Sequence, residues 1–133
     1  MSVHGIGVDL ASVARLDRLR ARDTAWRRWF SAAERMRCAE APHPDRRAAE
    51  IFAAKEATFK ALALAPWDGR VPWAWIDTAP IGTGRLAVRL SGPVAAAAGD
   101  RLHIEVSVAS DERVATAFAI ALADDAAPAR DAR

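Results

Sequence analysis

Apolar residues recur along the first part of the chain with a period that changes from strand-like to helical. Residues 3–9 form a short run of β-branched residues and glycines, which predicts a strand that ends at Asp9. Ser12 follows in the position of a helix N-cap. Apolar residues then recur at three-residue steps, so we expect a first helix over residues 13–21, with its arginines on the opposite face.

The next apolar pattern is aromatic and also helical. Spacings of three and four within residues 26–33 predict a second short helical stretch whose aromatic face lies in the core, with Ser31 starting a further turn. Stacking of these rings on a nucleic acid is the alternative, but a helical aromatic stripe is typical of a core. Two prolines within residues 41–44 then interrupt the chain, and we expect the longest helix over residues 45–64, before Pro66.

The second half of the chain alternates between apolar and polar positions, as strands of an antiparallel sheet do. After a turn at residues 67–69, we expect two strands around a turn at residues 80–82, and two more around a turn at residues 110–112. Together these elements predict the α+β class, with one long and several short helices packed against a mainly antiparallel sheet. The expected bounds are 73–76, 86–90, 102–108 and 114–122 for the strands and 92–98 for a short helix.

Length and composition indicate a single folded domain. Of 133 residues, 52% are hydrophobic and 27% are charged, which is typical of globular proteins. We expect residues 1–123 to form the domain and the tail at 124–133 to be disordered. Cys38 is the only cysteine, and the N-terminus lacks the pattern of a secretion signal. No apolar run approaches the roughly 20 residues of a membrane span, so we expect a cytoplasmic protein that is not in a membrane.

Positive charge is concentrated in one segment, although the formal net charge is only +2. Between Arg15 and Arg37 eight arginines stand against three acidic residues, which predicts a basic face on the first helices. The two interpretations of this face are a docking site for an acidic macromolecule and an ordinary solvated helix surface. We expect no nucleic-acid partner, because the net charge is low and no known nucleic-acid-binding motif is present.

The two lysines of the chain lie close together. Of 19 basic residues, all are arginine except Lys55 and Lys60. Lysine has a compact ammonium that can change protonation when buried, so this pattern favours a task that arginine cannot perform, with chance clustering as the alternative. On a helix with 100° per residue, Lys55 falls inside the apolar arc, so its ammonium has to reach an anion or water.

Glu56 and Lys60 are one helical turn apart on the same predicted helix. Alone they would be interpreted as a salt bridge worth about 0.3–0.5 kcal/mol. The neighbouring Lys55 and a second carboxylate, Asp9, at a strand end, favour a functional site instead. Two carboxylates from separate elements are the usual protein ligands of Mg2+, which completes its shell with water and substrate phosphates. Lysines beside such a site neutralise charge that develops during attack on phosphorus.

Two motifs of the chain resemble the signature motifs of the phosphopantetheinyl transferases. The first is Gly5–Asp9 followed by Arg15, and the second is Phe52–Leu62, whose sequence is FAAKEATFKAL. Their order and separation are also similar to those of the family. The short chain and its opening resemble the holo-acyl-carrier-protein synthase type in particular. The resemblance extends to about Leu122 and is loose between residues 64 and 99.

The resemblance implies a reaction and roles for four residues. The reaction is transfer of the 4′-phosphopantetheine arm of coenzyme A to a serine of an acyl or polyketide carrier protein, with release of 3′,5′-adenosine bisphosphate. By this similarity, Asp9 and Glu56 would hold Mg2+ against the pyrophosphate. Lys60 would contact the phosphates or assist proton removal, and Lys55 would lie beside them.

The resemblance also implies partners for the basic face and for the chain itself. Arg15, Arg18 and Arg22 on the first helix would meet an acidic helix of the carrier protein. Family members of this size are typically trimers with active sites between subunits, so we expect a homotrimer.

Four positions depart from the family pattern. Ile51 stands where the family often has an arginine, and Ala63 stands where it commonly has a glycine. Ser107–Ser110 replaces a strand that usually ends in histidine, and Asp111 follows at once. These departures leave open the coenzyme A contacts and the base.

The missing histidine leaves three candidates for the group that takes the serine proton: Asp111, Glu56 and a water at the metal. We expect Lys55, Lys60 and Ser110 to contact coenzyme A. The competing hypothesis is a non-catalytic homologue that keeps the fold and the basic face and binds a carrier protein without transfer.

Overall fold

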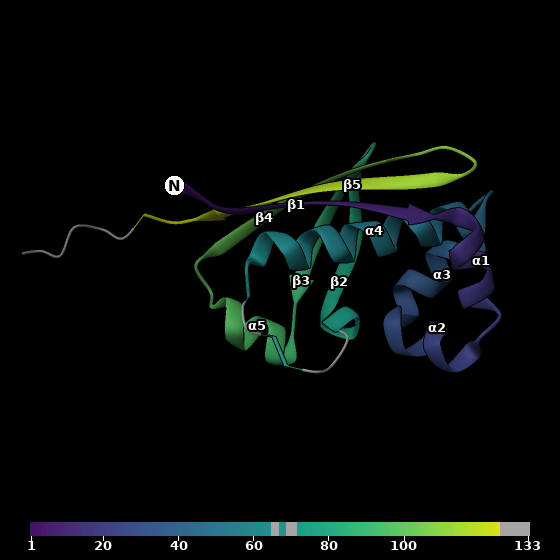
Figure 1. The fold of residues 1–133 in the computed structure, drawn as a ribbon, viewed down its shortest axis with the longest axis horizontal. Helices are drawn as coiled ribbons and strands as arrows, with labels where there is room; N and C mark the ends of the chain where they lie inside the picture. The colour runs from purple at the N-terminus through teal and green to yellow at the C-terminus, as the bar shows by residue number, and fades with distance from the viewer. Residues whose placement is uncertain (65–66, 69–71, 126–133) are drawn as a thin grey trace, which may run out of the picture.

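Five strands form an antiparallel sheet in the order β1-β5-β4-β3-β2 (Figure 1). The structure is a computed structural model, and it describes residues 1–64, 67–68 and 72–125. β5 pairs with β1 on one side and with β4 on the other along most of its length, whereas β3 pairs with β4 only near its own start. The strands are β1 (Ser2–Ser12), β2 (Ile76–Gly82), β3 (Arg85–Leu90), β4 (Leu102–Ser110) and β5 (Val114–Ala123).

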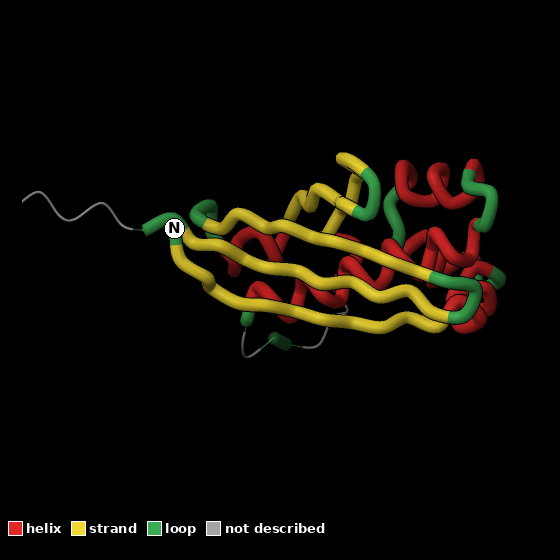
Figure 2. The backbone as a smooth tube through the Cα atoms, turned by 90° about the horizontal axis from the view of Figure 1, so that it is seen from above, coloured by secondary structure: helices red, strands yellow, loops and turns green. Residues whose placement is uncertain are grey.

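The helices lie on one face of this sheet (Figures 1 and 2). The longest, α4, runs along β1 and β5, with α1, α2 and α3 gathered at one end and α5 at the other. The predicted α+β class, with one long and several short helices on a mainly antiparallel sheet, is confirmed. In the described part of the chain no helix combines the length and the apolar character needed to cross a bilayer. The helices are α1 (Val13–Arg20), α2 (Asp23–Trp29), α3 (Ala32–Glu40), α4 (Pro44–Leu62), α5 (Gly92–Ala98) and the 3-10 helix η1 (Pro72–Trp75).

Local sequence explains where these helices begin and end. The hydroxyl oxygen of Ser12 accepts a hydrogen bond from the backbone N–H of Arg15 at 3.3 Å and so caps α1. Pro44 opens α4, where its missing N–H costs no helical hydrogen bond. At the other end Ala63 adopts the left-handed conformation, with φ of 52°, and stops the helix. The bounds of α4 are therefore close to those predicted.

The further helical turn predicted to start at Ser31 is confirmed, and it belongs to a separate helix, α3. Phe30 has an extended backbone, and the Ser31 side chain accepts a hydrogen bond from the N–H of Glu34 at 3.1 Å. This cap starts a new helix, so the stretch divides into the end of α2 and the start of α3.

The first hairpin also differs from the prediction. Residues 73–75 lie in η1 rather than in a strand, and residues 80–82 belong to β2. Pro80 does not end the strand, because β2 is at the edge of the sheet and a missing N–H is tolerated there. The chain instead turns just before β3, where Gly84 has a φ of 66°. The predicted turn at 67–69 and the predicted tail at 124–133 extend outside the described residues.

Small side chains line the contact between α4 and the sheet. Both α4 and β5 contribute buried alanines to the core between them. Small residues on both sides allow the two backbones to approach more closely than larger side chains would. The buried alanines are Ala48, Ala49, Ala53, Ala54, Ala57 and Ala61 in α4 and Ala115, Ala117, Ala119 and Ala121 in β5.

The closest approach is between β1 and α4. A Cβ atom added at Gly5 would lie 2.2 Å from the carbonyl oxygen of Ala61, and one added at Gly7 would lie 1.9 Å from that of Ala57. Both distances are far below van der Waals contact, and the atoms approached belong to backbone, which cannot turn aside. The two glycines are therefore required for β1 to pack on α4 at this separation.

We expect Gly7→Ala to lower the free energy of unfolding by about 3 kcal/mol, because the new methyl group must push β1 away from α4. Urea denaturation followed by circular dichroism measures the change. Gly82→Ala is the matched control, since a Cβ at that position meets no atom within 4 Å. Equal stability of the two variants would show that β1 and α4 are not in the close contact described.

Candidate active site

The contact between β1 and α4 also determines where Asp9 lies. Side chains alternate along a strand, so Gly5, Gly7 and Asp9 all face the helix. The carboxylate of Asp9 is buried to 9% exposure, and its Oδ1 accepts a hydrogen bond from Lys60 Nζ at 2.9 Å. Lys60 Nζ also donates to the Val8 carbonyl oxygen at 3.0 Å. The end of β1 and the second half of α4 are thus joined by the contact between the Asp9 carboxylate and the Lys60 ammonium.

Glu56 lies against Asp9 on the same side of α4. The pKa of the Glu56 carboxyl is raised to about 7, mainly by burial and also by a hydrogen bond to Asp9 and the negative charge of Asp9, while the charges of Lys60 and Arg15 act in the opposite direction. Two carboxylates this close repel each other when both are ionised. The second oxygen of Asp9, Oδ2, is buried and accepts no hydrogen bond from an N–H or hydroxyl donor of the described residues.

These two carboxylates fit a divalent cation that keeps most of its shell for other ligands. A cation between them would relieve their repulsion and occupy the free Asp9 oxygen. Within the described residues no group of three or more His, Cys, Asp or Glu side chains forms a complete metal cage. The protein would therefore contribute two ligands, Asp9 and Glu56. Water and substrate oxygens would complete the coordination, as Mg2+ prefers.

Lys55 does not lie with Asp9, Glu56 and Lys60, although it directly precedes Glu56 in the sequence. Its side chain is buried in the interior, where Nζ lies 2.9 Å from Glu34 Oε1 and donates to the carbonyl oxygens of Trp29 at 2.8 Å and Trp73 at 2.9 Å. Burial lowers the pKa of Lys55 and raises that of Glu34 to about 7. The anion that Lys55 was expected to reach is thus a protein carboxylate, and its contact with coenzyme A stays a prediction.

Ser110 and Asp111 lie at the turn between β4 and β5, apart from the two carboxylates. The Ser110 hydroxyl accepts a hydrogen bond from Arg46 Nε at 2.7 Å and donates to Glu50. Asp111 is exposed, and the backbone N–H groups of Arg113 and Val114 donate to it, which lowers its pKa. Among the described residues no hydrogen bond or ion pair joins either side chain to Glu56.

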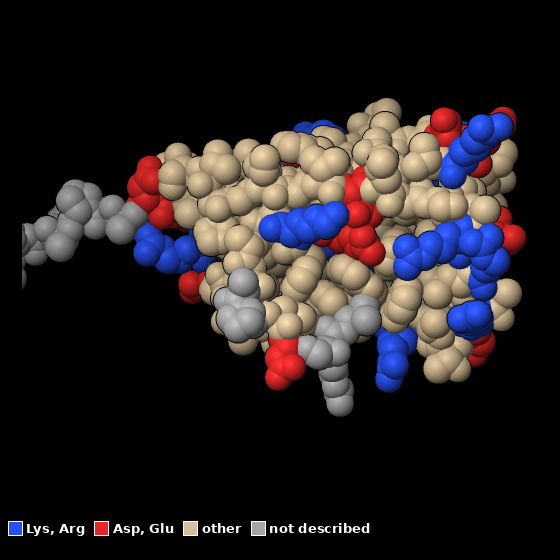
Figure 3. Space-filling model, viewed as in Figure 1, with Lys and Arg blue, Asp and Glu red and all other residues tan. Residues whose placement is uncertain are grey.

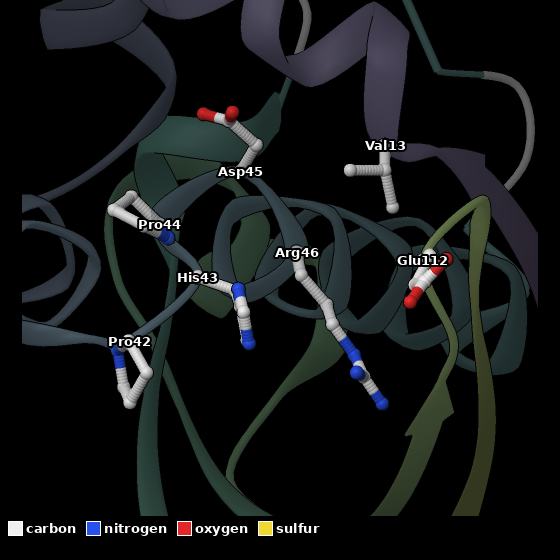
Figure 4. Close-up of a pocket in the computed structure, with 7 residues that line it drawn as sticks. All are labelled: Val13, Pro42, His43, Pro44, Asp45, Arg46 and Glu112. Carbon is white, nitrogen blue, oxygen red and sulfur yellow. The ribbon is translucent and has the colours of Figure 1, made fainter.

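A surface pocket of about 280 Å³ opens beside this turn (Figure 4). Figure 4 shows Arg46 and His43 from the start of α4 on one side, and Glu112 from the turn on the other. It is lined by Val13, Pro42, His43, Pro44, Asp45, Arg46 and Glu112. The pocket therefore mixes both signs of charge and does not include the Asp9 and Glu56 carboxylates.

The basic face predicted on the first helices is divided into paired and unpaired arginines. Some are held by acidic side chains or carbonyl oxygens, as Arg20 is by Asp45 and Arg37 is by Thr78. Arg18 and Arg22 are exposed and make no side-chain hydrogen bond or ion pair with the described residues. The guanidinium of Arg15 lies over the Phe52 ring at 5.5 Å, on the way from this face to Glu56. Figure 3 shows acidic side chains in the middle of this view, with basic ones gathered toward the end that α1, α2 and α3 cover.

Sequence analysis missed the polar partners of two of its candidate residues. Glu34, the partner of Lys55, is completely buried. The signal was available, because Glu34 lies four residues after Phe30 and four before Cys38, on the apolar face of α3. Arg46, the partner of Ser110, offered no comparable signal, since a contact between α4 and the β4–β5 turn depends on the tertiary fold.

Comparison with known proteins agrees with the two motifs. Residues 5–123 match the family model of the 4′-phosphopantetheinyl transferase superfamily. A holo-[acyl-carrier-protein] synthase of Methylobacterium nodulans is 36% identical over 128 residues, covering 87% of this chain and 93% of the relative. A holo-[acyl-carrier-protein] synthase of Clavibacter michiganensis is 35% identical over 125 residues, covering 92% of this chain and 98% of the relative.

Solved structures show the same fold. An ACPS–CoA complex from Chronobacterium ammoniagenes superposes with a TM-score of 0.74 at 28% identity, covering 91% of this chain and 98% of the other. The acyl carrier protein synthase of Mycobacterium tuberculosis superposes with a TM-score of 0.70 at 28% identity, covering 92% and 100%.

The chain therefore belongs to the 4′-phosphopantetheinyl transferase superfamily, a family of transferases. Within it, the chain is of the holo-acyl-carrier-protein synthase type, and the resemblance inferred from the motifs is confirmed.

We expect the Glu56 carboxyl to titrate near pH 7 in the metal-free protein, rather than near its ordinary value of 4.5. Since the folded-state pKa is raised, the contribution of Glu56 to stability is present below pH 4.5 and is lost as the pH rises through 7. Carboxyl carbon chemical shifts measured by NMR across this range test the value. In the Asp9→Asn variant, which removes the neighbouring charge, the Glu56 pKa should fall; an unchanged pKa would contradict the pairing of the two carboxylates.

Proposed function

We propose that this protein transfers the 4′-phosphopantetheine arm of coenzyme A to a serine of a carrier protein, in a Mg2+-dependent reaction. The observation that supports the proposal most directly is the meeting of Asp9, Glu56 and Lys60 at the contact of β1 with α4. The serine oxygen would form a bond to the β-phosphorus of coenzyme A. The bond from this phosphorus to the leaving phosphate would break and release 3′,5′-adenosine bisphosphate.

Each residue at this site has a role that follows from its chemistry. Asp9 and Glu56 would hold Mg2+, which when bound supplies positive charge to the pyrophosphate oxygens. Lys60, which is about half exposed with a side-chain accessibility of 54%, can turn its ammonium toward a phosphate while it stays near Asp9. The serine proton has to leave as the new bond forms. The candidate acceptors are Glu56, Asp111 and a water at the metal.

The carrier protein would dock on the exposed arginines of the first helices. Arg18 and Arg22 are available for acidic side chains of a partner, and Arg15 lies between them and the carboxylates. An acidic helix bound along this face would bring its serine toward the site by charge complementarity, which mainly accelerates encounter.

The open face of the sheet supports self-association. Four apolar side chains of β1 are 54–68% exposed, and Phe118 of β5 lies beside them at 43%. An apolar surface of this kind marks an interaction site. We propose that it joins copies of the chain into a homotrimer, in which the β4–β5 turn of one copy would bring Ser110 and Asp111 to the carboxylates of the next. The four residues of β1 are Val3, Ile6, Val8 and Leu10.

Incubation with an apo-carrier protein, coenzyme A and Mg2+ tests the transfer. We expect the carrier to gain a mass of about 340 Da, as one phosphopantetheine attached to serine requires, and Asp9→Ala to abolish the gain. Mass spectrometry of the intact carrier gives the result, and chelation of Mg2+ should have the same effect as Asp9→Ala. Carrier binding without any mass change would instead favour the non-catalytic homologue. Several apo-carriers of fatty-acid and polyketide type would identify the partner.

Co-expression of two inactive variants tests whether sites are shared between copies. We expect Asp9→Ala and Asp111→Asn each to lower activity strongly by itself. Mixed assemblies should regain activity at about one quarter of the sites, since random assembly pairs an intact Asp9 with an intact Asp111 from the next copy at that frequency. Full turnover of Asp111→Asn alone would exclude this acid as the base. Absence of any recovery would place each site within one chain.

A further inference from the structure

Among the described residues, the most deeply buried ionisable side chains lie apart from the Asp9 and Glu56 carboxylates. Lys55 is 1% exposed and Glu34 is fully buried, and their side chains lie 2.9 Å apart. The Lys55 ammonium donates hydrogen bonds to the carbonyl oxygens of Trp29 and Trp73 and forms an ion pair with Glu34. All three contacts are made within the protein interior.

These contacts connect several elements to the helix that holds Glu56. The Lys55 ammonium reaches the end of α2 at Trp29, α3 at Glu34, and η1 at Trp73. Asp77 of β2 lies near this pair and acts electrostatically on both side chains. One residue of α4 is therefore tied by polar contacts to three other elements.

On the side of α4 that faces the sheet, the directional contacts lie toward the ends of the helix. Arg46 and Glu50 bond to Ser110 near its start, and Lys60 donates to Val8 and Asp9 near its end. Elsewhere this side packs through small groups, such as the glycines of β1 against the backbone of Ala57 and Ala61, and contacts of this kind resist rotation and sliding only weakly. Buried polar pairs, by contrast, can select one arrangement among several of similar packing energy.

We propose that Lys55 and Glu34 are positioning residues, which fix the rotation and axial position of α4 and so set the separation of Glu56 from Asp9. Glu56 is the next residue of the helix, so a rotation of α4 moves its carboxylate directly. This inference rests on the proposed function, because the carboxylate pair matters for the reaction only if it holds the metal. It differs from the sequence-based expectation that Lys55 contacts coenzyme A.

The test removes the ion pair without leaving a single buried charge. The double variant Glu34→Leu with Lys55→Met replaces both charges by apolar side chains of similar size, which in other proteins often preserves folding. Lys55→Arg is the second variant, since it keeps the charge and changes only the geometry. Leu86→Ala is the control: it removes a core side chain in β3 and no contact of Lys55 or Glu34.

Two measurements separate positioning from the other roles. Mn2+ binding, followed by electron paramagnetic resonance, reports the metal site without any turnover. Thermal unfolding reports stability. We expect the double variant and Lys55→Arg to be folded at the assay temperature and to bind Mn2+ about tenfold more weakly, with a lower kcat for transfer. The control should lose stability and keep its Mn2+ affinity.

Three results would overturn the inference. Wild-type Mn2+ affinity and kcat in either folded variant would mean that the pair serves stability alone. A rise in KM for coenzyme A with unchanged Mn2+ affinity would mean that Lys55 contacts the substrate. A parallel loss of Mn2+ affinity in Leu86→Ala would mean that any destabilisation has the same effect. A different result would show that the proposed function itself is wrong: the unmodified protein would then neither bind Mn2+ nor modify a carrier.

Discussion

The structure depends on one close contact, in which the backbone of β1 lies directly on the backbone of α4. Side chains at positions 5 and 7 would collide with the carbonyl oxygens of Ala61 and Ala57, so glycine is required at both. The same alternation that turns these glycines toward the helix turns Asp9 toward it two residues later. A packing requirement and a chemical requirement are therefore met by one short stretch of strand, because the helix surface that accepts the glycines also presents Glu56 and Lys60.

The two lysines illustrate how a short distance along a helix separates structural from chemical roles. Lys60 lies at the edge of the sheet contact, where it reaches Asp9 and keeps access to solvent. Lys55 points into the interior, where it is paired with a carboxylate and donates to two carbonyl oxygens. Removing the Lys55–Glu34 pair from water costs free energy that its attraction often does not recover. The pair is therefore better explained as a means of holding α4 in one position than as a source of stability.

The candidate site residues fall into two groups in the structure. The carboxylates, Lys60 and Arg15 converge in the single copy. Ser110 and Asp111 lie at the turn between β4 and β5 and make no hydrogen bond or ion pair to Glu56 within the described residues. On the other face of the sheet, β1 and β5 leave large apolar side chains exposed, so β1 alternates between small inward residues and large apolar outward ones.

Sequence alone determined the class of fold, the family, and the two motifs, because the strand and helix periods are local and the motifs combine rare residues at fixed spacing. It also indicated that Lys55 is buried, from its angle on the helix. Only the tertiary structure decided that Glu34 is the anion Lys55 reaches and that Arg46 and Glu50 hold Ser110. Those pairs join residues 21 to 64 positions apart, and their formation depends on how elements pack, which no local pattern encodes. That Asp9 and Lys60 share a site was expected from the two motifs, and the structure adds the contact between them. The misplaced hairpin turn has the same origin, since Pro80 is tolerated in β2 only because that strand is at the sheet edge.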